Sequence, residues 1–201
     1  MNEKYSISPG GEEFPLPDHQ DYREEFEKLK KRVEVERSKN REIVVVMGVG
    51  FVGAVMAAIV ADTVDQDGQP SKFVIGMQRP SVRSFWKIPL LNRGVSPVKA
   101  EDPEVDPMIA RCVRDKKTLI ATYTYDVLKL ADVVVVDVQC DYIKEDLGDV
   151  RTGQTDMAAL ESSLHVIAEH IPANALVLIE TTVAPGTTEQ VAYPIMKKVF
   201  K

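Results

Sequence analysis

Three closely spaced glycines are the first candidates for chemistry in this chain. Gly48, Gly50 and Gly53 fit the pattern G-x-G-x-x-G, after the β-branched block 43–46 and before an apolar, helix-like segment that ends near Thr63. In such a strand, turn and helix, the first glycine permits the tight turn, the second lets a pyrophosphate approach the backbone, and the third lets helix and strand pack closely. Amides at the helix start then face the phosphates. The spacing predicts a dinucleotide site, with a purely structural turn as the alternative.

The same glycines lie inside an uncharged run of 19 residues, Ile43 to Ala61. A membrane-spanning helix needs about 20 apolar residues, so length alone permits a crossing. However, each glycine would weaken a helix by about 1 kcal/mol, and the valines before them favour a strand. The run is therefore predicted to be a buried strand, a turn and a buried helix, and no membrane partner is expected.

A second candidate position follows the next predicted strand, Phe73 to Met77. Dinucleotide-binding folds usually have an Asp or Glu after this strand, which accepts hydrogen bonds from the adenosine ribose. This chain has Gln78 and Arg79 there. Gln78 can still bond a ribose hydroxyl, and Arg79 or Arg83 can pair with a 2′-phosphate, unless both arginines are solvated loop residues. NAD is the expected cofactor, and NADP stays open.

Composition narrows the class of protein. A chain of 201 residues that is 44% hydrophobic can form one ordinary globular core with an appendage. A net charge of -6 argues against a nucleic-acid partner or an anionic membrane surface. Cys112 and Cys140 are far apart and have no histidine cluster nearby, so neither a metal site nor a disulfide framework is indicated. The first 30 residues lack the features of a secretory signal, which predicts a cytoplasmic location.

The chain divides into an N-terminal extension, residues 1–40, and a dinucleotide-binding domain, residues 41–201. The first 18 residues contain three prolines and two adjacent glycines, which predicts an irregular or disordered lead-in. The pattern then changes to a helical one, in which apolar residues recur on a single stripe: Tyr22, Phe26, Leu29 and Val33. An added amphipathic helix is expected there.

Beyond residue 41, strand-like and helix-like segments alternate. The predicted strands are 43–47, 73–77, 118–121, 133–136 and 175–180, and the predicted helices are 51–63, 107–113, 126–131, 157–170, with Asp156 as its cap, and 187–200. The polar stretch 141–156 is predicted to be a loop up to that cap. Continuous apolar strands between helices indicate a parallel sheet. The predicted fold class is α/β, a Rossmann-like doubly wound parallel sheet with helices on both faces, plus the added N-terminal helix.

Four segments also give the domain a family resemblance. They are MGVGFVG at 47–53, LLNRGVSPVKAEDP at 90–103, ADVVVVDVQ at 131–139 and IETTVAPGTTEQV at 179–191. From Ile43 onward the chain resembles the N-terminal domain of the UDP-glucose/GDP-mannose dehydrogenase family, the NAD-dependent nucleotide-sugar 6-dehydrogenases. The last segment is the most specific, because it is similar to the family's E-S-T-V-x-P-G-T-T signature. The resemblance covers about four-fifths of this chain and only the first half of a typical family member.

The resemblance assigns cofactor contacts to individual residues. The family's pyrophosphate loop falls on Gly48, Gly50, Phe51, Val52 and Gly53. Its ribose aspartate falls on Gln78, which is a departure beside Arg79, and a basic residue near the adenosine phosphate falls on Arg83.

The other implied site residues lie later in the chain. Val138 and Gln139 fall on a strand end beside the cofactor, where Cys140 and Asp141 replace the family's Thr-Pro. Thr182 matches a threonine whose hydroxyl lies near the nicotinamide and helps to hold a catalytic water. Its alternative role is a strand-end hydroxyl bonded to local backbone.

The family chemistry implies two oxidations at C6 of a UDP- or GDP-sugar, giving the uronate through a cysteine-bound thiohemiacetal and thioester. In the family this cysteine, and the lysine and asparagine that stabilise the oxyanion, lie beyond the point that corresponds to residue 201, so this chain alone is expected to be inactive. Two alternatives stay open: a truncated non-catalytic nucleotide-binding module, or another Rossmann hydride-transfer dehydrogenase. A homodimer through the added helix or an exposed sheet edge is also expected.

Overall fold

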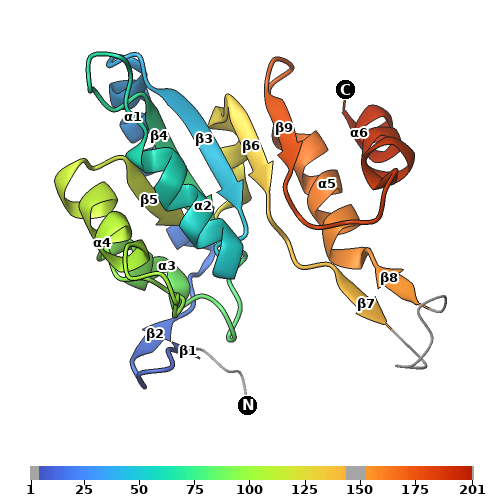
Figure 1. The fold of residues 1–201 in the computed structure, drawn as a ribbon, viewed down its shortest axis with the longest axis horizontal. Coiled ribbons are helices and arrows are strands. Elements are labelled where there is room, and N and C mark those ends of the chain that lie inside the picture. Colours follow the sequence, from blue (N-terminus) through green and yellow to red (C-terminus); the bar gives the residue numbers. More distant parts are fainter. Residues whose placement is uncertain (1–4, 144–152, 201) are drawn as a thin grey trace.

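The computed structural model describes residues 5–143 and 153–200, and its centre is a five-stranded parallel sheet (Figure 1). The strands lie in the order β5-β4-β3-β6-β9. Chain order therefore runs outward from β3 in both directions, which is the doubly wound arrangement of a Rossmann-like fold. The predicted α/β fold class is confirmed. The strands are β3 (Glu42–Met47), β4 (Lys72–Met77), β5 (Leu119–Thr122), β6 (Val133–Val136) and β9 (Leu176–Ile179).

The three inner strands are buried on both faces, as their unbroken apolar sequences predict. In β3, Val45 and Val46 point to opposite faces and both are fully buried. In-register pairing aligns Val44 with Val74 of β4 and with Val133 of β6. At the edge, β9 is different, because Leu176 and Leu178 are both exposed.

Small residues allow the first covering helix to approach the sheet closely. Helix α2 (Phe51–Asp62) buries Ala54, Ala57, Ala58 and Ala61 against β3 and β4. The same face is completed by α3 (Lys87–Asn92) and α4 (Val105–Ala110), with a π-helical turn at Arg111–Asp115. The predicted helix at 107–113 is thus present as α4 and this turn. Within residues 5–143 and 153–200, none of the helices combines the length and the hydrophobicity that a bilayer crossing requires.

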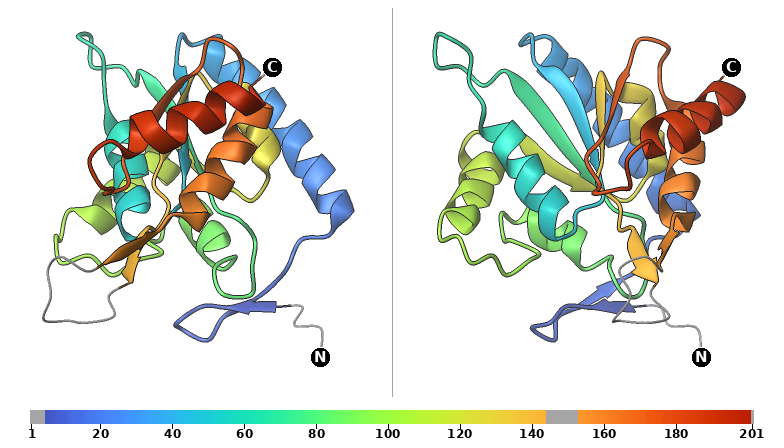
Figure 2. Two further views of the ribbon diagram at one scale, coloured as in Figure 1. Left: turned by 90° about the vertical axis from the view of Figure 1, so that its right-hand side faces the viewer. Right: turned by 45° about the vertical axis from the view of Figure 1, so that its right-hand side comes forward.

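The opposite face is covered by the N-terminal helix and by elements from the second half of the chain (Figure 2). Of the predicted stripe on α1 (His19–Arg37), Leu29 and Val33 are buried, whereas Tyr22 and Phe26 are half-buried. The other elements of this layer are the 3-10 helix η2 (Tyr125–Leu130), α5 (Ala158–His170), the π-helical turn η3 (Thr188–Ala192) and α6 (Tyr193–Val199).

Helix α1 begins three residues before Tyr22 because its first turn is capped by side chains. The Asp18 carboxylate accepts the backbone N–H groups of Gln20, at 2.8 Å, and Asp21, at 3.1 Å. In return, the Asp21 carboxylate accepts the N–H of Asp18 at 2.8 Å. This reciprocal capping box satisfies donors that a helix start otherwise leaves open.

Residues 5–15 correct the prediction of an irregular lead-in. Strands β1 (Tyr5–Ile7) and β2 (Glu13–Pro15) form an antiparallel hairpin at the carboxyl-end edge of the sheet (Figure 1). Its turn is closed by hydrogen bonds from Ser8 N–H to the Glu12 carbonyl and from Gly11 N–H to the Ser8 carbonyl, both at 2.9 Å. The strands are too short for a periodic pattern, and their stability comes from contacts with distant residues. Residues 1–4 lie outside the described part.

The predicted loop at 141–156 is also wrong in part. Strands β7 (Asp141–Ile143) and β8 (Gln154–Asp156) pair antiparallel at its two ends, and residues 144–152 lie outside the described residues. Asp156 lies one residue before the N-cap of α5, not at the N-cap as predicted, but its side chain still bonds the first turn of the helix. Met157 occupies the N-cap of α5, and the Asp156 carboxylate accepts the Ala158 N–H at 3.0 Å.

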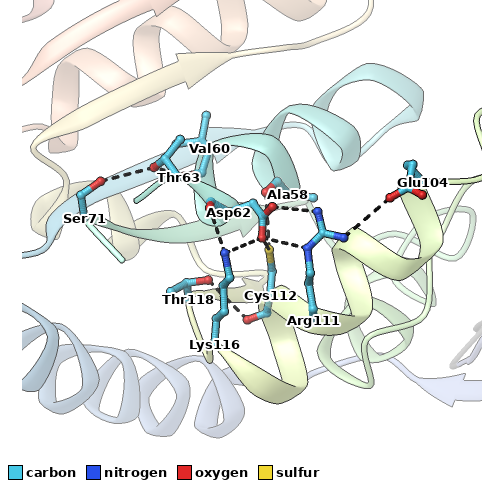
Figure 3. Close-up of polar contacts among 10 residues, drawn as sticks. All are labelled: Ala58, Val60, Asp62, Thr63, Ser71, Glu104, Arg111, Cys112, Lys116 and Thr118. Atoms are coloured by element: carbon cyan, nitrogen blue, oxygen red, sulfur yellow. Dashed lines mark hydrogen bonds and ion pairs between the residues drawn. The ribbon is translucent and has the colours of Figure 1, made fainter. Parts of the chain in front are cut away.

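An ion-pair cluster ties the C-terminal end of α2 to the segment after α4 (Figure 3). The Asp62 carboxylate accepts two hydrogen bonds from the Arg111 guanidinium, at 2.7 and 3.0 Å, and lies 2.8 Å from Lys116 Nζ. These contacts hold the pKa of Asp62 far below its usual range, and the hydrogen bond from Arg111 is the largest cause. The buried Cys112 thiol lies 3.5 Å from the same carboxylate, and burial, followed by Asp62, raises the pKa of Cys112 to about 11. Such a thiol is inert, so the cluster is structural.

Candidate functional site

A cleft of about 520 Å³ opens at the carboxyl ends of β3, β4 and β6. Parallel α/β sheets bind ligands at this edge, where the chain order reverses between neighbouring strands. A larger cavity, about 790 Å³, lies between the β1–β2 hairpin and the loop around Pro97. It lies away from the strand ends and from the glycine loop, so the smaller cleft is the candidate site.

Each glycine of the loop has a distinct structural reason. Gly48 has a φ of +105°, and an added Cβ would lie 2.0 Å from the Asp137 carbonyl oxygen. At Gly53, a Cβ would lie 1.8 Å from the Gly48 carbonyl oxygen. At Gly50, in contrast, a Cβ would meet nothing within 4 Å. The fold therefore requires glycine at positions 48 and 53. Gly50 instead leaves open space beside the cleft, where a ligand can approach the backbone.

The start of α2 offers amide donors to the cleft. Gly50 is the N-cap and has no side chain to bond the first-turn N–H groups. The first intrahelical bond of α2 runs from Ala54 N–H to the Gly50 carbonyl. The Gly53 N–H is directed at the Asp137 carboxylate, so the Phe51 and Val52 N–H groups are the donors that face a ligand. Open amides at a helix N-terminus bind anions, so this loop is a candidate site for a diphosphate.

Gln78 lies where the sequence predicts a ribose contact, and it also supports the glycine loop. Its Oε1 accepts the Val49 N–H at 3.2 Å, while its Nε2 faces the Ser84 hydroxyl at 3.5 Å. Both Gln78 and Arg79 line the cleft. The Gln78 amide thus connects the end of β4 to the glycine loop.

Asp137 is the most important cleft residue that the sequence reasoning missed. It follows β6, lines the cleft and faces the start of α2. Burial raises the pKa of Asp137, and the Gly53 backbone amide partly opposes this shift. Burial and then the nearby Asp137 charge raise the pKa of Glu180 as well. A polar residue that ends the run of four valines was the available signal.

Lys87 and Tyr125 also line the cleft without having been predicted. Lys87 is the first residue of α3, and burial lowers its pKa. Burial raises the pKa of Tyr125, and the charge of Arg79 partly offsets the shift. Neither residue belongs to a sequence motif, because loops separated by many residues bring them to the cleft.

Some of the remaining predicted residues line the cleft and others do not. Val138 and Gln139 line it, whereas Phe51 and Val52, on the first turn of α2, are 62% and 51% exposed. Arg83 is exposed on the loop after β4 and is not a lining residue.

Thr182 is exposed, follows the end of β9 and does not line the cleft. Its neighbour Thr181 makes the backbone contacts. The Thr181 hydroxyl accepts the Val138 N–H at 3.0 Å and donates to the Val138 carbonyl at 2.8 Å. Thr181 therefore fixes the strand end that carries Val138, and the role of Thr182 stays a prediction.

Comparisons with known proteins agree with this geometry. The sequence model of the UDP-glucose/GDP-mannose dehydrogenase family, NAD binding domain, matches residues 42–201. A UDP-N-acetyl-D-mannosamine dehydrogenase from Pyrococcus horikoshii is 28% identical over 149 residues, which are 74% of this chain and 30% of that protein.

Solved structures show the same relationship. An NDP-N-acetyl-D-galactosaminuronic acid dehydrogenase from Methanosarcina mazei superposes with a TM-score of 0.67 at 29% identity, covering 86% of this chain and 33% of its own. The UDP-D-ManNAc dehydrogenase of Pyrococcus horikoshii gives a TM-score of 0.59 at 28% identity, covering 77% and 32%. The chain thus spans about a third of the length of these relatives. It belongs to the UDP-glucose/GDP-mannose dehydrogenase family, and residues 42–201 match the family's NAD-binding domain.

Proposed function

We propose that this chain supplies the nicotinamide-dinucleotide-binding part of an enzyme that oxidises the C6 hydroxyl of a nucleotide-linked sugar to a carboxylate. The observation that carries the proposal is the glycine loop, with two sterically closed glycines around the open Gly50. The family membership supports the reaction class. Two of the relatives are named for N-acetylated sugars, so a nucleotide-linked N-acetylhexosamine is a substrate candidate beside UDP-glucose and GDP-mannose.

The residues of this chain divide the work at the cleft. The first-turn amides of α2 hold the diphosphate, Gln78 orients the adenosine ribose, and Val138 and Gln139 border the nicotinamide end. When bound, the nicotinamide ring accepts a hydride from the sugar carbon. Thr182 is proposed to help position water near that carbon. We expect these residues to bind the dinucleotide.

Titration of the chain with NADH and NADPH, followed by nicotinamide fluorescence, tests the proposal. Saturable binding of at least one cofactor is expected. If neither binds, the cleft is not a dinucleotide site and the proposed function fails.

Gly50→Val separates binding from folding. Because a Cβ at residue 50 meets nothing within 4 Å, the variant should change the free energy of unfolding by no more than about 1 kcal/mol. The added methyls would occupy the path of the diphosphate to the backbone, so its hydrogen bonds are lost and affinity falls by about 10- to 100-fold. Chemical unfolding and the fluorescence titration measure the two effects. Unchanged affinity would contradict the assigned role of the loop.

Asp137→Asn should strengthen cofactor binding. The Asp137 carboxylate faces the start of α2, where the diphosphate is proposed to lie, so the two negative charges repel each other. Removing about 1–2 kcal/mol of this repulsion should raise the affinity for the cofactor by roughly 10-fold. In the wild type, protonation of Asp137 favours the anionic ligand, so affinity should fall as pH rises through its raised pKa.

A titration series over pH checks this prediction, with Asp115→Asn, at an exposed carboxylate outside the cleft, as control. The Asp137→Asn substitution should flatten the pH dependence in the acidic range, and the control should not. Equal pH profiles for the wild type and Asp137→Asn would exclude the proposed repulsion.

A further inference from the structure

The adenosine end of the cleft lacks the carboxylate that normally selects NAD. Gln78 follows β4, where an acidic side chain would accept hydrogen bonds from the ribose and repel a phosphate on it. The Gln78 Oε1 is already engaged by the Val49 N–H, at 3.2 Å. Its Nε2 therefore presents N–H donors towards the loop that follows, and donors suit an anion.

The loop at 79–84 concentrates cationic and hydroxyl groups at the same place. Arg79 lines the cleft, and Arg83 is exposed four residues later. Within residues 5–143 and 153–200 neither guanidinium forms an ion pair, although the chain carries a net charge of -6. The Ser81 and Ser84 hydroxyls are 2.8 Å apart, and Gln78 Nε2 lies 3.5 Å from the second of them.

The acidic residue of the cleft lies on the other side of the central strand. Asp137 follows β6, whereas this loop follows β4, and β3 separates the two strands in the sheet. A phosphate beside Arg79 would therefore be further from that carboxylate than the diphosphate at the glycine loop.

The N-terminal hairpin holds the loop at 79–84 in place. The fully buried Ser6 hydroxyl donates to the Val82 carbonyl at 2.7 Å and accepts the Trp86 N–H at 3.1 Å. Trp86 Nε1 in turn donates to the Arg83 carbonyl at 3.0 Å. A loop ordered before the ligand arrives loses less conformational entropy on binding, which favours affinity.

We propose that Gln78 and Arg79, with the linked Ser81 and Ser84 hydroxyls beside them, form a binding site for a ribose 2′-phosphate, which makes NADP(H) the preferred cofactor of this chain. The inference rests on the proposed function, because it assigns the cofactor class of the same cleft. It departs from the cofactor that the acidic residue usually selects at this position.

The test compares NADH and NADPH titrations of the 201-residue chain at one ionic strength. We expect NADPH to bind about 10- to 100-fold more tightly, since charge-assisted hydrogen bonds to the extra phosphate contribute about 1.5–3 kcal/mol. Adenosine 2′,5′-bisphosphate should displace NADPH more effectively than 5′-AMP does.

Two variants assign the effect to the loop. Arg79→Ala should weaken NADPH by about 10-fold or more and leave NADH within about 2-fold, because only NADPH has the contacted phosphate. Gln78→Glu keeps the side-chain length and an acceptor for the Val49 N–H, and should reverse the preference towards NADH. Arg23→Ala, at an exposed arginine of α1, is the matched control and should change neither affinity.

The outcomes separate this inference from the proposed function. If the wild type binds NADH at least as tightly as NADPH, or if Arg79→Ala weakens both cofactors equally, the 2′-phosphate site is disproved while dinucleotide binding stands. If neither cofactor binds at all, the proposed function fails and the inference fails with it.

Discussion

Replacing Gly48 by alanine is expected to destabilise the domain by about 4 kcal/mol or more. The residue has a φ of +105°, which an alanine rarely adopts, and the new Cβ would lie 2.0 Å from the Asp137 carbonyl oxygen. Both contacting groups are backbone, so no side chain can rotate away. Relief requires β3 and β6 to separate at their carboxyl ends.

Urea unfolding followed by circular dichroism measures this loss, and Gly50→Ala is the control. The control adds the same methyl group two residues later, where nothing lies within 4 Å, so its unfolding free energy should change by no more than about 1 kcal/mol. Equal midpoints for the two variants would show that the loop is not as closely packed as the structure describes.

The second large effect is expected at the opposite end of α2. Asp62→Ala should cost about 2–3 kcal/mol, between the values for exposed and buried ion pairs, because its carboxylate is partly exposed and bonds Arg111 and Lys116. The matched control is Asp126→Ala, which removes an exposed pair with Lys129 and should cost at most about 1 kcal/mol.

The Asp62 contribution should also depend on pH. Ion pairing lowers the pKa of Asp62 in the folded state, so the unfolded state takes up the proton first as pH falls. The stabilisation is therefore complete above the ordinary carboxyl pKa and is lost as pH falls towards the lowered folded value. Unfolding of Asp62→Asn over this acidic range should show a weaker pH dependence than the wild type, and an equal dependence would contradict the cluster's role.

The sequence predicts the parts of the fold that rest on local pattern. The valine-rich blocks of β3 and β6 and the helix predicted at 157–170 were located to within a residue or two, because each of these elements buries a continuous apolar surface. The tight turn at Gly48 and the close packing at Gly53 were also predicted, since the turn is a local structure, whereas the pyrophosphate contact at Gly50 stays a prediction.

Features built from distant contacts could not be predicted in this way. The β1–β2 hairpin has three-residue strands, and Ser6 holds it to a loop 76 residues away. Lys87, Tyr125 and Asp137 line one cleft only because the starts of α3 and η2 lie beside the end of β6. Likewise, the sequence gives no reason why Thr181 bonds the backbone beside Val138 while Thr182 faces outward.

The position of α1 has a consequence for synthesis of the chain on the ribosome. Its side chains bond partners that are made much later: Glu25 contacts Thr122, Arg32 contacts the Lys117 carbonyl, and Arg37 contacts Asp132. Contacts between residues so far apart in sequence form slowly. Helix α1 must therefore wait outside the exit tunnel, with its apolar stripe uncovered, until most of the sheet has been translated, and it would be a target for nascent-chain chaperones during that time.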